Sequence, residues 1–390
     1  MWRIFLMVSL LCWSADGQRV TCRDHNNGEV DWYIIYKAPK LKDIKTDGLE
    51  YIYIDSKGKK KETSKDHNKL INAADGVLAN TLRPILKPIK SMTDNFGFIT
   101  YNDQPPGCNA FATFGHSKGV VMMDKTTTGV WLSHSTPQFP FKRDQNKFYP
   151  TSGAKHAQTF ICVTFNYKEF KDIGQHLLDI AAFPFDHHIP TGFHEQLIKV
   201  TEKDLKENPP GGKISDLTSP GQQAFVTFAK KLYEGEIFTV EPRFDGDLYL
   251  TIAEHYQTNV RVQTWGCQDG RERSYCGKNR KVINIESVKP NLGNREVKWK
   301  ASNDHSKWCV AEDNNNDLIC IADVNRAVTQ YKRPGGALCF RHKEASKLFE
   351  DVIDKTELCP SPTTTSAGSK RTHSSSSTSD TSAACDSDSD

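Results

Sequence analysis

The chain has 390 residues, a hydrophobic fraction of 37% and a formal net charge of +3 at pH 7. This charge is a mild bias toward anionic partners and does not by itself indicate nucleic-acid binding. Beyond the N-terminus, no segment approaches the ~18 apolar residues that a membrane helix needs, which excludes a membrane-spanning protein.

Both ends of the chain are predicted to lie outside the fold. Residues 1–17 have the pattern of a secretory signal peptide, in which a basic residue precedes an apolar run and small residues precede cleavage before Gln18. Residues 361–390 are rich in Ser, Thr and Asp and cannot bury enough apolar surface, so we expect a disordered tail. The remaining residues, 18–360, are enough for two domains or for one domain built from two halves.

Eleven cysteines are present, and nine of them lie between the signal peptide and the tail. Because the signal peptide directs the chain to an oxidising compartment and the cysteines lack zinc-type CxxC pairs, we expect disulfides. Nine is odd, so at least one cysteine stays free or pairs elsewhere, and spacing alone leaves the connectivity open. No Asn-x-Ser/Thr acceptor occurs, so N-glycosylation is not expected.

Residues 18–205 form the predicted N-terminal half, in which strand-like and helix-like segments alternate. A polar turn after residue 124 predicts a hairpin. Helical spacing of apolar residues predicts helices over 71–86 and 170–183. Segments rich in aromatic and β-branched residues predict strands over 30–37, 49–55, 96–102, 109–115, 119–124, 129–135 and 158–166.

Residues 206–223 are dense in Pro, Gly and Ser and are predicted to link the two halves. In the C-terminal half, residues 224–360, a helix is predicted over 246–257. The order of elements partly repeats that of the first half, which suggests internal duplication, and the alternation favours an α/β fold with mixed sheets. The strands predicted in this half are 259–265, 281–287, 296–302, 308–312 and 318–325.

The tripeptide His-Ser-Lys occurs once in each half, at 116–118 and at 305–307. Both copies have apolar, strand-like surroundings, whereas a third His-x-Lys at 67–69 lies in a charged run that we interpret as a solvated surface. On a strand, residues i and i+2 share a face, so each histidine would project beside its lysine. One copy alone would be read as an ordinary polar pair, and two copies in matched settings favour catalysis.

Phosphodiester cleavage can use all four of these side chains. A neutral imidazole can attack phosphorus and form a phosphohistidine, a protonated imidazole can protonate the leaving oxygen, and two lysines can neutralise the nonbridging oxygens. Two copies related by an approximate dyad would put one imidazole on each side of the phosphorus. This chemistry needs no cofactor and no metal, and the sequence holds no compact acidic cluster of the two-metal type.

Several longer motifs carry a resemblance to a known family. They are VDWYIIYKAPK, GHSKGVVMMD, WLSHSTPQFP, DHSKWCV, CIADVNR and GGALC, in this order over most of residues 20–358. The chain resembles deoxyribonuclease II, the acid endonuclease of lysosomes. That family in turn resembles the phospholipase D superfamily, in which two His-x-Lys motifs from two similar halves form one active site. The Asp that usually follows each motif in the superfamily is not at the expected spacing here.

The resemblance implies a phospholipase D-like α/β fold of two similar halves, with mixed sheets flanked by helices and the active site at the pseudo-dyad between the halves. It implies metal-independent cleavage of double-stranded DNA at acid pH, leaving 3′-phosphate and 5′-hydroxyl ends, with little sequence specificity. An acid preference would follow because one imidazole must be neutral while the other is charged. We expect a protein of the lysosome or a secreted protein, with no membrane partner; a homodimer is left open.

The resemblance also implies roles for individual residues. His116 is the expected nucleophile and His305 the general acid, with the reverse division left open. Lys118 and Lys307 would hold the phosphate. Further candidates for substrate binding are His134 and Asn325.

The resemblance implies three disulfides, where spacing alone left the pairing open. Among the remaining cysteines, Cys108 and Cys267 could pair if the two halves bring them together, and Cys309 has no assigned partner. The three implied bridges are Cys22–Cys162, Cys276–Cys359 and Cys320–Cys339.

Other interpretations compete with some of these predictions. The histidines of 186–190, with His194, could bind a metal, but adjacent histidines on an extended chain point in opposite directions, so a loop is the better interpretation. The basic run 56–65 is interpreted as a solvated face rather than a DNA contact. Two rival functions are a catalytically inactive DNA-binding or interaction protein on the same fold and a phospholipase D-like phosphodiesterase acting on lipid.

Overall fold

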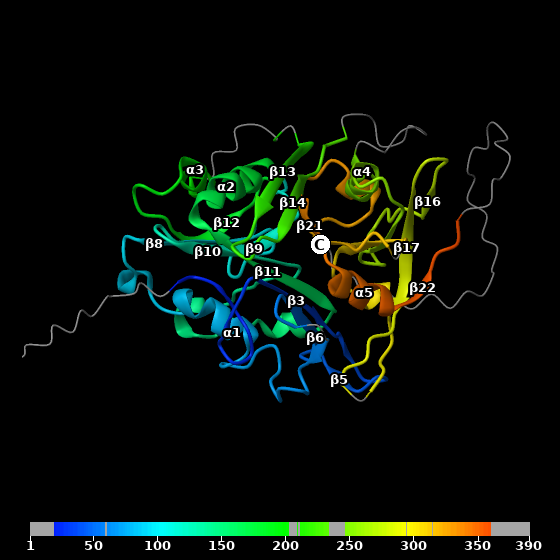
Figure 1. Cartoon of the computed structure of the whole chain (residues 1–390), viewed down its shortest axis with the longest axis horizontal. Helices are drawn as coiled ribbons and strands as arrows, with labels where there is room; N and C mark the ends of the chain where they lie inside the picture. Colours follow the sequence, from blue (N-terminus) through cyan, green and yellow to red (C-terminus); the bar gives the residue numbers. More distant parts are fainter. Residues whose placement is uncertain are drawn as a thin grey trace, which may run out of the picture.

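The structure is a computed structural model, shown in Figure 1. The predicted signal peptide and tail, with Cys12 and Cys385, lie outside the described residues. The residues that it describes are 19–58, 61–202, 209, 211–233, 246–293, 295–313 and 315–359.

The N-terminal half builds one sheet in which every described pair of strands is antiparallel. The predicted hairpin is confirmed, because Val120 of β9 pairs with Leu132 of β10. In spatial order the strands are β12 (Pro184–His188), β8 (Phe96–Asn102), β9 (Lys118–Asp124), β10 (Thr128–His134), β11 (Gln158–Asn166), β3 (Trp32–Lys37), β6 (Tyr51–Asp55) and β7 (Glu62–Thr63).

The C-terminal half builds a second sheet, which contains one parallel pair, β15 with β17. The prediction of mixed sheets therefore holds for this half only, because the first sheet is joined throughout by antiparallel neighbours. In spatial order the strands are β13 (Lys213–Thr218), β14 (Ala224–Ala229), β21 (Gly336–Arg341), β20 (Leu318–Ala322), β19 (Trp308–Ala311), β15 (Val260–Gln263), β17 (Lys281–Val288) and β16 (Tyr275–Cys276), with β18 (Trp299–Lys300) and β22 (Ile353–Thr356) also paired to β17. Two small ribbons are formed by β1 (Cys22–Arg23) with β2 (Glu29–Val30) and by β4 (Lys40–Leu41) with β5 (Thr46–Asp47).

Few helices cover these sheets. The α-helices are α1 (Val77–Leu82), α2 (Phe170–Asp179), α3 (Glu195–Thr201), α4 (Leu248–His255) and α5 (Lys343–Asp351). The shorter 3-10 helices are η1 (Arg83–Ile85), η2 (Ile89–Ser91), η3 (Arg143–Gln145), η4 (Thr151–Ala154), η5 (Tyr167–Glu169), η7 (Ala301–Asn303) and η8 (Val328–Gln330). Helix α4 lies within the predicted range 246–257, and the Asp247 carboxylate caps its first turn by accepting the backbone N–H groups of Tyr249 and Leu250.

The two sheets share one hydrophobic core. Trp32 of β3 packs edge-on against Phe340 of β21, with ring centroids 5.1 Å apart, and Phe165 of β11 packs against Phe225 of β14. Helices α2 and α5 bury apolar faces in the same core. The halves seen side by side in Figure 1 are thus held together by continuous apolar packing, which fixes the position of one His-Ser-Lys motif relative to the other.

Some predicted elements differ from the structure. The segment 109–115, predicted as a strand, consists of turns and irregular backbone after Pro105 and Pro106. The helix predicted over 71–86 is reduced to α1, because Gly76 precedes its first turn and Pro84 ends regular α-helix. The strand predicted over 296–302 is reduced to β18, and the predicted linker 206–223 contains β13, which pairs with β14.

The disulfides agree with those that the resemblance implies. The structure pairs Cys22 with Cys162, Cys276 with Cys359, and Cys320 with Cys339. Cys108 and Cys309 are free, and Cys267 is disulfide-bonded, so the alternative pairing of Cys108 with Cys267 is wrong. Disulfides are typical of the secretory pathway. Among the described residues, no helix has the length and apolar character to cross a membrane.

Candidate active site

The first His-Ser-Lys lies at the entry to β9, and the C-terminal half holds its histidine in place. The backbone N–H of His116 donates to the Pro334 carbonyl at 2.9 Å. Its ring Nδ1 lies 2.7 Å from the Asp323 carbonyl oxygen. A carbonyl only accepts, so Nδ1 carries the proton and the lone pair of the neutral ring is at Nε2.

The second His-Ser-Lys lies just before β19, and the N-terminal half holds its histidine. The backbone N–H of His305 donates to the Ala157 carbonyl at 3.0 Å. Its ring stacks on His156, with centroids 3.9 Å apart, and contacts Trp265 at 4.5 Å. Each motif is therefore held by groups of the other half. Sequence reasoning that puts both motifs within regular strands is wrong, because His116 lies two residues before β9 and His305 lies three residues before β19.

Asp103, at the end of β8, joins the charged groups around the first motif. Its carboxylate accepts from Lys118 Nζ at 2.5 Å and from Arg333 Nη2 at 2.9 Å. The same carboxylate lies 3.8 Å from Nε2 of His116. Asp103 is buried, so these partners compensate a carboxylate that would otherwise be costly to bury. It links the first motif to Arg333 of the other half.

His305 lies within electrostatic range of the other motif. Its pKa is held well below its usual range by burial first, and then by the positive charges of Lys307, His156, Lys118 and His116. Its Nε2 has no hydrogen-bond partner within the part of the chain that the structure describes. The fold thus brings the four predicted catalytic side chains into one electrostatic cluster.

A cleft of about 660 Å³ opens at this cluster. His305, His156 and Asp103 line it, together with Lys155 and residues of the irregular segment after Asp103. The cleft gives an extended ligand access to the histidine of the second motif. Behind it, burial raises the pKa of the Asp323 carboxyl to about 7.

His134 and Asn325 lie close to the cluster without lining the cleft. His134 is buried, its ring stacks on Phe160 at 5.6 Å, and its Nδ1 accepts the backbone N–H of Thr136 at 3.1 Å. Asn325 accepts from the backbone N–H of Trp265 and donates to Gln268, so both ends of its amide are used within the protein. Both side chains thus contact protein groups outside the cleft lining.

Sequence reasoning missed several residues around the site. Asp103, His156, Trp265 and Arg333 belong to no repeated motif. The one available signal is position, because Asp103 directly follows the predicted strand 96–102 and strand ends often carry functional side chains. Asp323 lies in the CIADVNR motif, yet it contributes through its backbone carbonyl, which no side-chain pattern reports.

One group of side chains could be read as a metal site. Ligand atoms of His25, Glu62 and His67 lie within 4.8 Å of one another. The two imidazoles are stacked in parallel, with centroids 3.7 Å apart, so their in-plane lone pairs do not converge on one point. His67 instead contacts Glu62 at 2.8 Å and His25 contacts Tyr51 at 2.9 Å, which describes a hydrogen-bonded cluster.

Comparison with known proteins places this site in a family. The family model described as Deoxyribonuclease II matches residues 21–359. Deoxyribonuclease-2-beta of Mus musculus is 32% identical over 368 residues, covering 90% of this chain and 98% of the relative. The human protein of the same name is 30% identical, covering 87% and 92%, and Plancitoxin-1 of Acanthaster planci is 30% identical, covering 88% and 93%.

Among solved structures, a yeast tyrosyl-DNA phosphodiesterase matches 62% of this chain and 70% of its own, with 8% identity and a TM-score of 0.29. The extent and identity of the sequence matches define the class of protein as a nuclease, a phosphodiester hydrolase. The chain belongs to the deoxyribonuclease II family.

Proposed function

We propose that the protein is an acid endodeoxyribonuclease that hydrolyses double-stranded DNA, without a metal, to 3′-phosphate and 5′-hydroxyl ends. The observation that carries the proposal is the reciprocal holding of the two motifs, in which each half supports the histidine of the other. Their approximate two-fold relation across one scissile phosphorus, on a phospholipase D-like fold, is part of this proposal. Binding through phosphates would give little sequence specificity.

The reaction proceeds in two steps. In the first, Nε2 of His116 attacks phosphorus, an N–P bond forms, and the P–O5′ bond breaks as His305 gives its proton to the leaving oxygen. In the second, His305 takes a proton from water, the water oxygen attacks the phosphohistidine, and the N–P bond breaks to release the 3′-phosphate. Lys118 and Lys307 neutralise the nonbridging oxygens in both steps.

The acid preference follows from the surroundings of His305. A general acid must carry a proton, and the pKa of His305 is held below its usual range by burial and by neighbouring cations. Its protonated form is therefore populated only at acid pH, and activity decreases as pH rises through that pKa. This working range suits a lysosome or another acid compartment of the secretory pathway. Degradation of DNA from dying cells would be a fitting role, and one relative is named Cell-death-related nuclease 7.

Plasmid digestion at pH ~5 with excess chelator tests the proposal. Wild-type protein should nick and linearise the plasmid, and His116→Ala and His305→Ala should each lose about 10³-fold or more in rate. Circular dichroism controls for folding. Activity that disappears with chelator, or that survives both substitutions, would falsify the mechanism. Wild-type protein that binds plasmid without cutting it would support the inactive DNA-binding alternative, and hydrolysis of a phospholipid instead of DNA would support the lipid alternative.

A further inference from the structure

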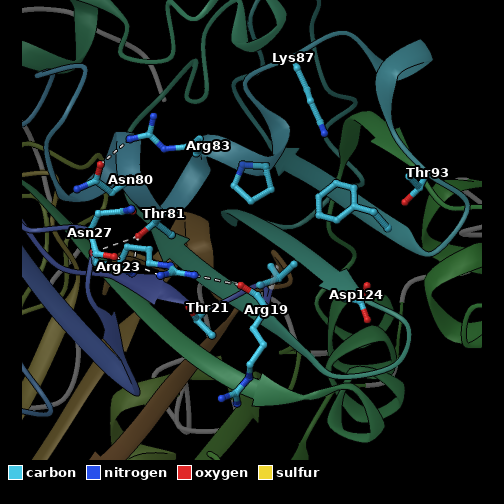
Figure 2. Close-up of a pocket in the computed structure, with 13 residues that line it drawn as sticks. Arg19, Thr21, Arg23, Asn27, Asn80, Thr81, Arg83, Lys87, Thr93 and Asp124 are labelled. Atoms are coloured by element: carbon cyan, nitrogen blue, oxygen red, sulfur yellow. Dashed lines mark hydrogen bonds between the residues drawn. The ribbon is translucent and has the colours of Figure 1, made fainter. Parts of the chain in front are cut away.

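A second pocket, of about 490 Å³, lies on the N-terminal half, outside the cleft. Four cationic side chains line it, Arg19, Arg23, Arg83 and Lys87, whereas Asp124 is the one acidic residue of its lining. Figure 2 shows Arg83 and Lys87 along one side and Arg19 on the other. The charge of this lining suits an anionic ligand.

Two of these cations, Arg83 and Lys87, form no salt bridge among the described residues, although the exposed Asp75 carboxylate lies within electrostatic range of Arg83. Arg23 and Arg19 lie 3.2 and 3.7 Å from the Glu29 carboxylate, which offsets part of their charge. Arg83 is oriented by the Asn80 side-chain carbonyl at 2.8 Å, and neither it nor Lys87 pairs with a carboxylate within the residues that the structure describes. An anion entering the pocket would meet an oriented guanidinium and an ammonium.

A buried hydroxyl provides an independent sign of a ligand. Thr21 lines the same pocket and is 5% exposed. Its Oγ1 has no hydrogen-bond partner among the described residues, and buried polar atoms are normally satisfied. A phosphate oxygen seated in the pocket would accept this hydrogen bond.

The pocket and the cleft lie at opposite ends of the same pair of strands. Lys118, which donates to the cleft-lining Asp103, lies opposite Asn102, and Asp124 of the pocket lies opposite Phe96. Lys118 and Asp124 are six positions apart on β9, so they share a face and are about 20 Å apart along the strand. About six base pairs of duplex cover that length.

Contacts between surface segments connect the two sites. Arg143 donates to the carbonyls of Ile85 and Lys87, which joins the rim of the pocket to the segment 138–155. That segment reaches the cleft at Lys155 and exposes Lys142 and Lys147 between the two sites, with Asp144 as an acidic neighbour. An exposed, mainly basic surface thus extends from the cleft to the pocket.

We propose that this pocket binds a backbone phosphate of the same DNA duplex, about six base pairs from the scissile phosphate. The proposal rests on the proposed function, since it takes the substrate to be DNA. The pocket adds affinity for long DNA and has no part in the chemical step. Short substrates, which cannot span both sites, do not gain from it.

The test compares two double variants of equal charge change. The pocket variant combines Arg83→Gln and Lys87→Gln, and the control variant combines Lys278→Gln and Lys281→Gln. The control residues are exposed near β16 and β17, on the side of the molecule opposite α1 in Figure 1. On a 30-base-pair duplex the pocket variant should raise KM about 10-fold and reduce the salt dependence of log KM by about one to two. The control should change neither, and both should hydrolyse a small chromogenic phosphodiester at the wild-type rate.

Thr21→Val should raise KM for the duplex in the same way, by a smaller factor. Equal effects of the pocket and control variants, or no effect of the pocket variant, would overturn the proposal. Failure of the proposed function would give a different result, because neither wild type nor any variant would cut DNA. Fluorescence anisotropy of the labelled duplex would still report whether Arg83 and Lys87 contribute to binding. Binding of a sulfated glycan that the duplex does not displace would also overturn it.

Discussion

The neutral imidazole of His116 presents the lone pair of Nε2 because Nδ1 donates to the Asp323 carbonyl, so Nε2 is the atom that would attack phosphorus in the proposed mechanism. With a substrate whose leaving group needs no proton, such as a p-nitrophenyl ester of thymidine 3′-phosphate, His305→Ala should still form the phosphohistidine and then stall. We expect a burst of one equivalent of nitrophenolate and an acid-labile mass increase on His116. His116→Ala should give no burst, and a burst from His116→Ala with none from His305→Ala would mean that the roles are reversed.

The pH dependence of activity is decided at His305 and its neighbour His156. His156 covers the His305 ring and is one of the cations that lower its pKa. His156→Ala should expose the ring and remove a positive charge, so the pKa of His305 should rise and the alkaline limb of kcat/KM should move up by about 1 pH unit. His156→Phe keeps the ring covered and should move the limb less. A shift toward lower pH in either variant would contradict the assignment of His305 as the acid.

At the scale of elements, the turn that carries His116 packs closely against the backbone of two other segments, at Ile180 and at Pro334. A Cβ added at Gly115 would lie 2.0 Å from the Ile180 carbonyl oxygen and 2.9 Å from that of Pro334. Gly115→Ala should therefore displace the His116 backbone from its supports. A displacement of about 1 Å should lower kcat about 10²-fold on DNA and on a small diester alike.

Gly107 provides the matched control for that substitution. It lies in the same irregular segment, has a φ of +76° and has no atom within 4 Å of an added Cβ. Asn adopts positive φ readily, so Gly107→Asn should keep activity near the wild-type value. If Gly115→Ala also keeps its activity, close support of His116 by its neighbours is not needed for catalysis.

At the scale of the whole molecule, Asp323 couples folding stability to pH. Burial raises the pKa of its carboxyl to about 7. Between the unfolded pKa and that value the folded state holds a proton that the unfolded state releases. The contribution to stability is therefore complete below the unfolded pKa and is lost progressively as pH rises to about 7. A pKa shift of this size corresponds to a change in the free energy of unfolding on the order of 4 kcal/mol.

Asp323→Asn removes this titration and keeps a side-chain oxygen for the Gly336 N–H, which Asp323 accepts at 3.0 Å. The variant should therefore be more stable than wild type at pH 8, by a larger margin than at pH 5, as measured by urea unfolding at each pH. The carbonyl that holds His116 is unchanged, so the expected loss of activity is small. A variant that is equally destabilised at both pH values would contradict the titration argument.

Buried histidines act in the opposite direction. Burial lowers the pKa of His176 to about 4, so the unfolded state binds more protons between that value and about 6.5, and stability decreases as pH falls through this range. Asp323 and His176 therefore offset each other in part between pH 4 and 6.5.

The sequence by itself determined the strands, the hairpin before His134 and the two His-Ser-Lys motifs, because these depend on residues adjacent in the chain. Its resemblance to a family also provided the disulfides. The strand predicted over 109–115 failed because its apolar residues follow two prolines and meet no partner strand. Local pattern alone does not report whether a segment finds a partner.

Only the tertiary structure decided which groups surround the two histidines of the His-Ser-Lys motifs. Asp103 meets Arg333, His156 covers His305, and Asn325 turns inward to hold Trp265. All three pairs are far apart in the sequence, and the first two meet because the two sheets share one core. Electrostatic surroundings depend on distances through space and on burial, and both exist only once the halves have packed together.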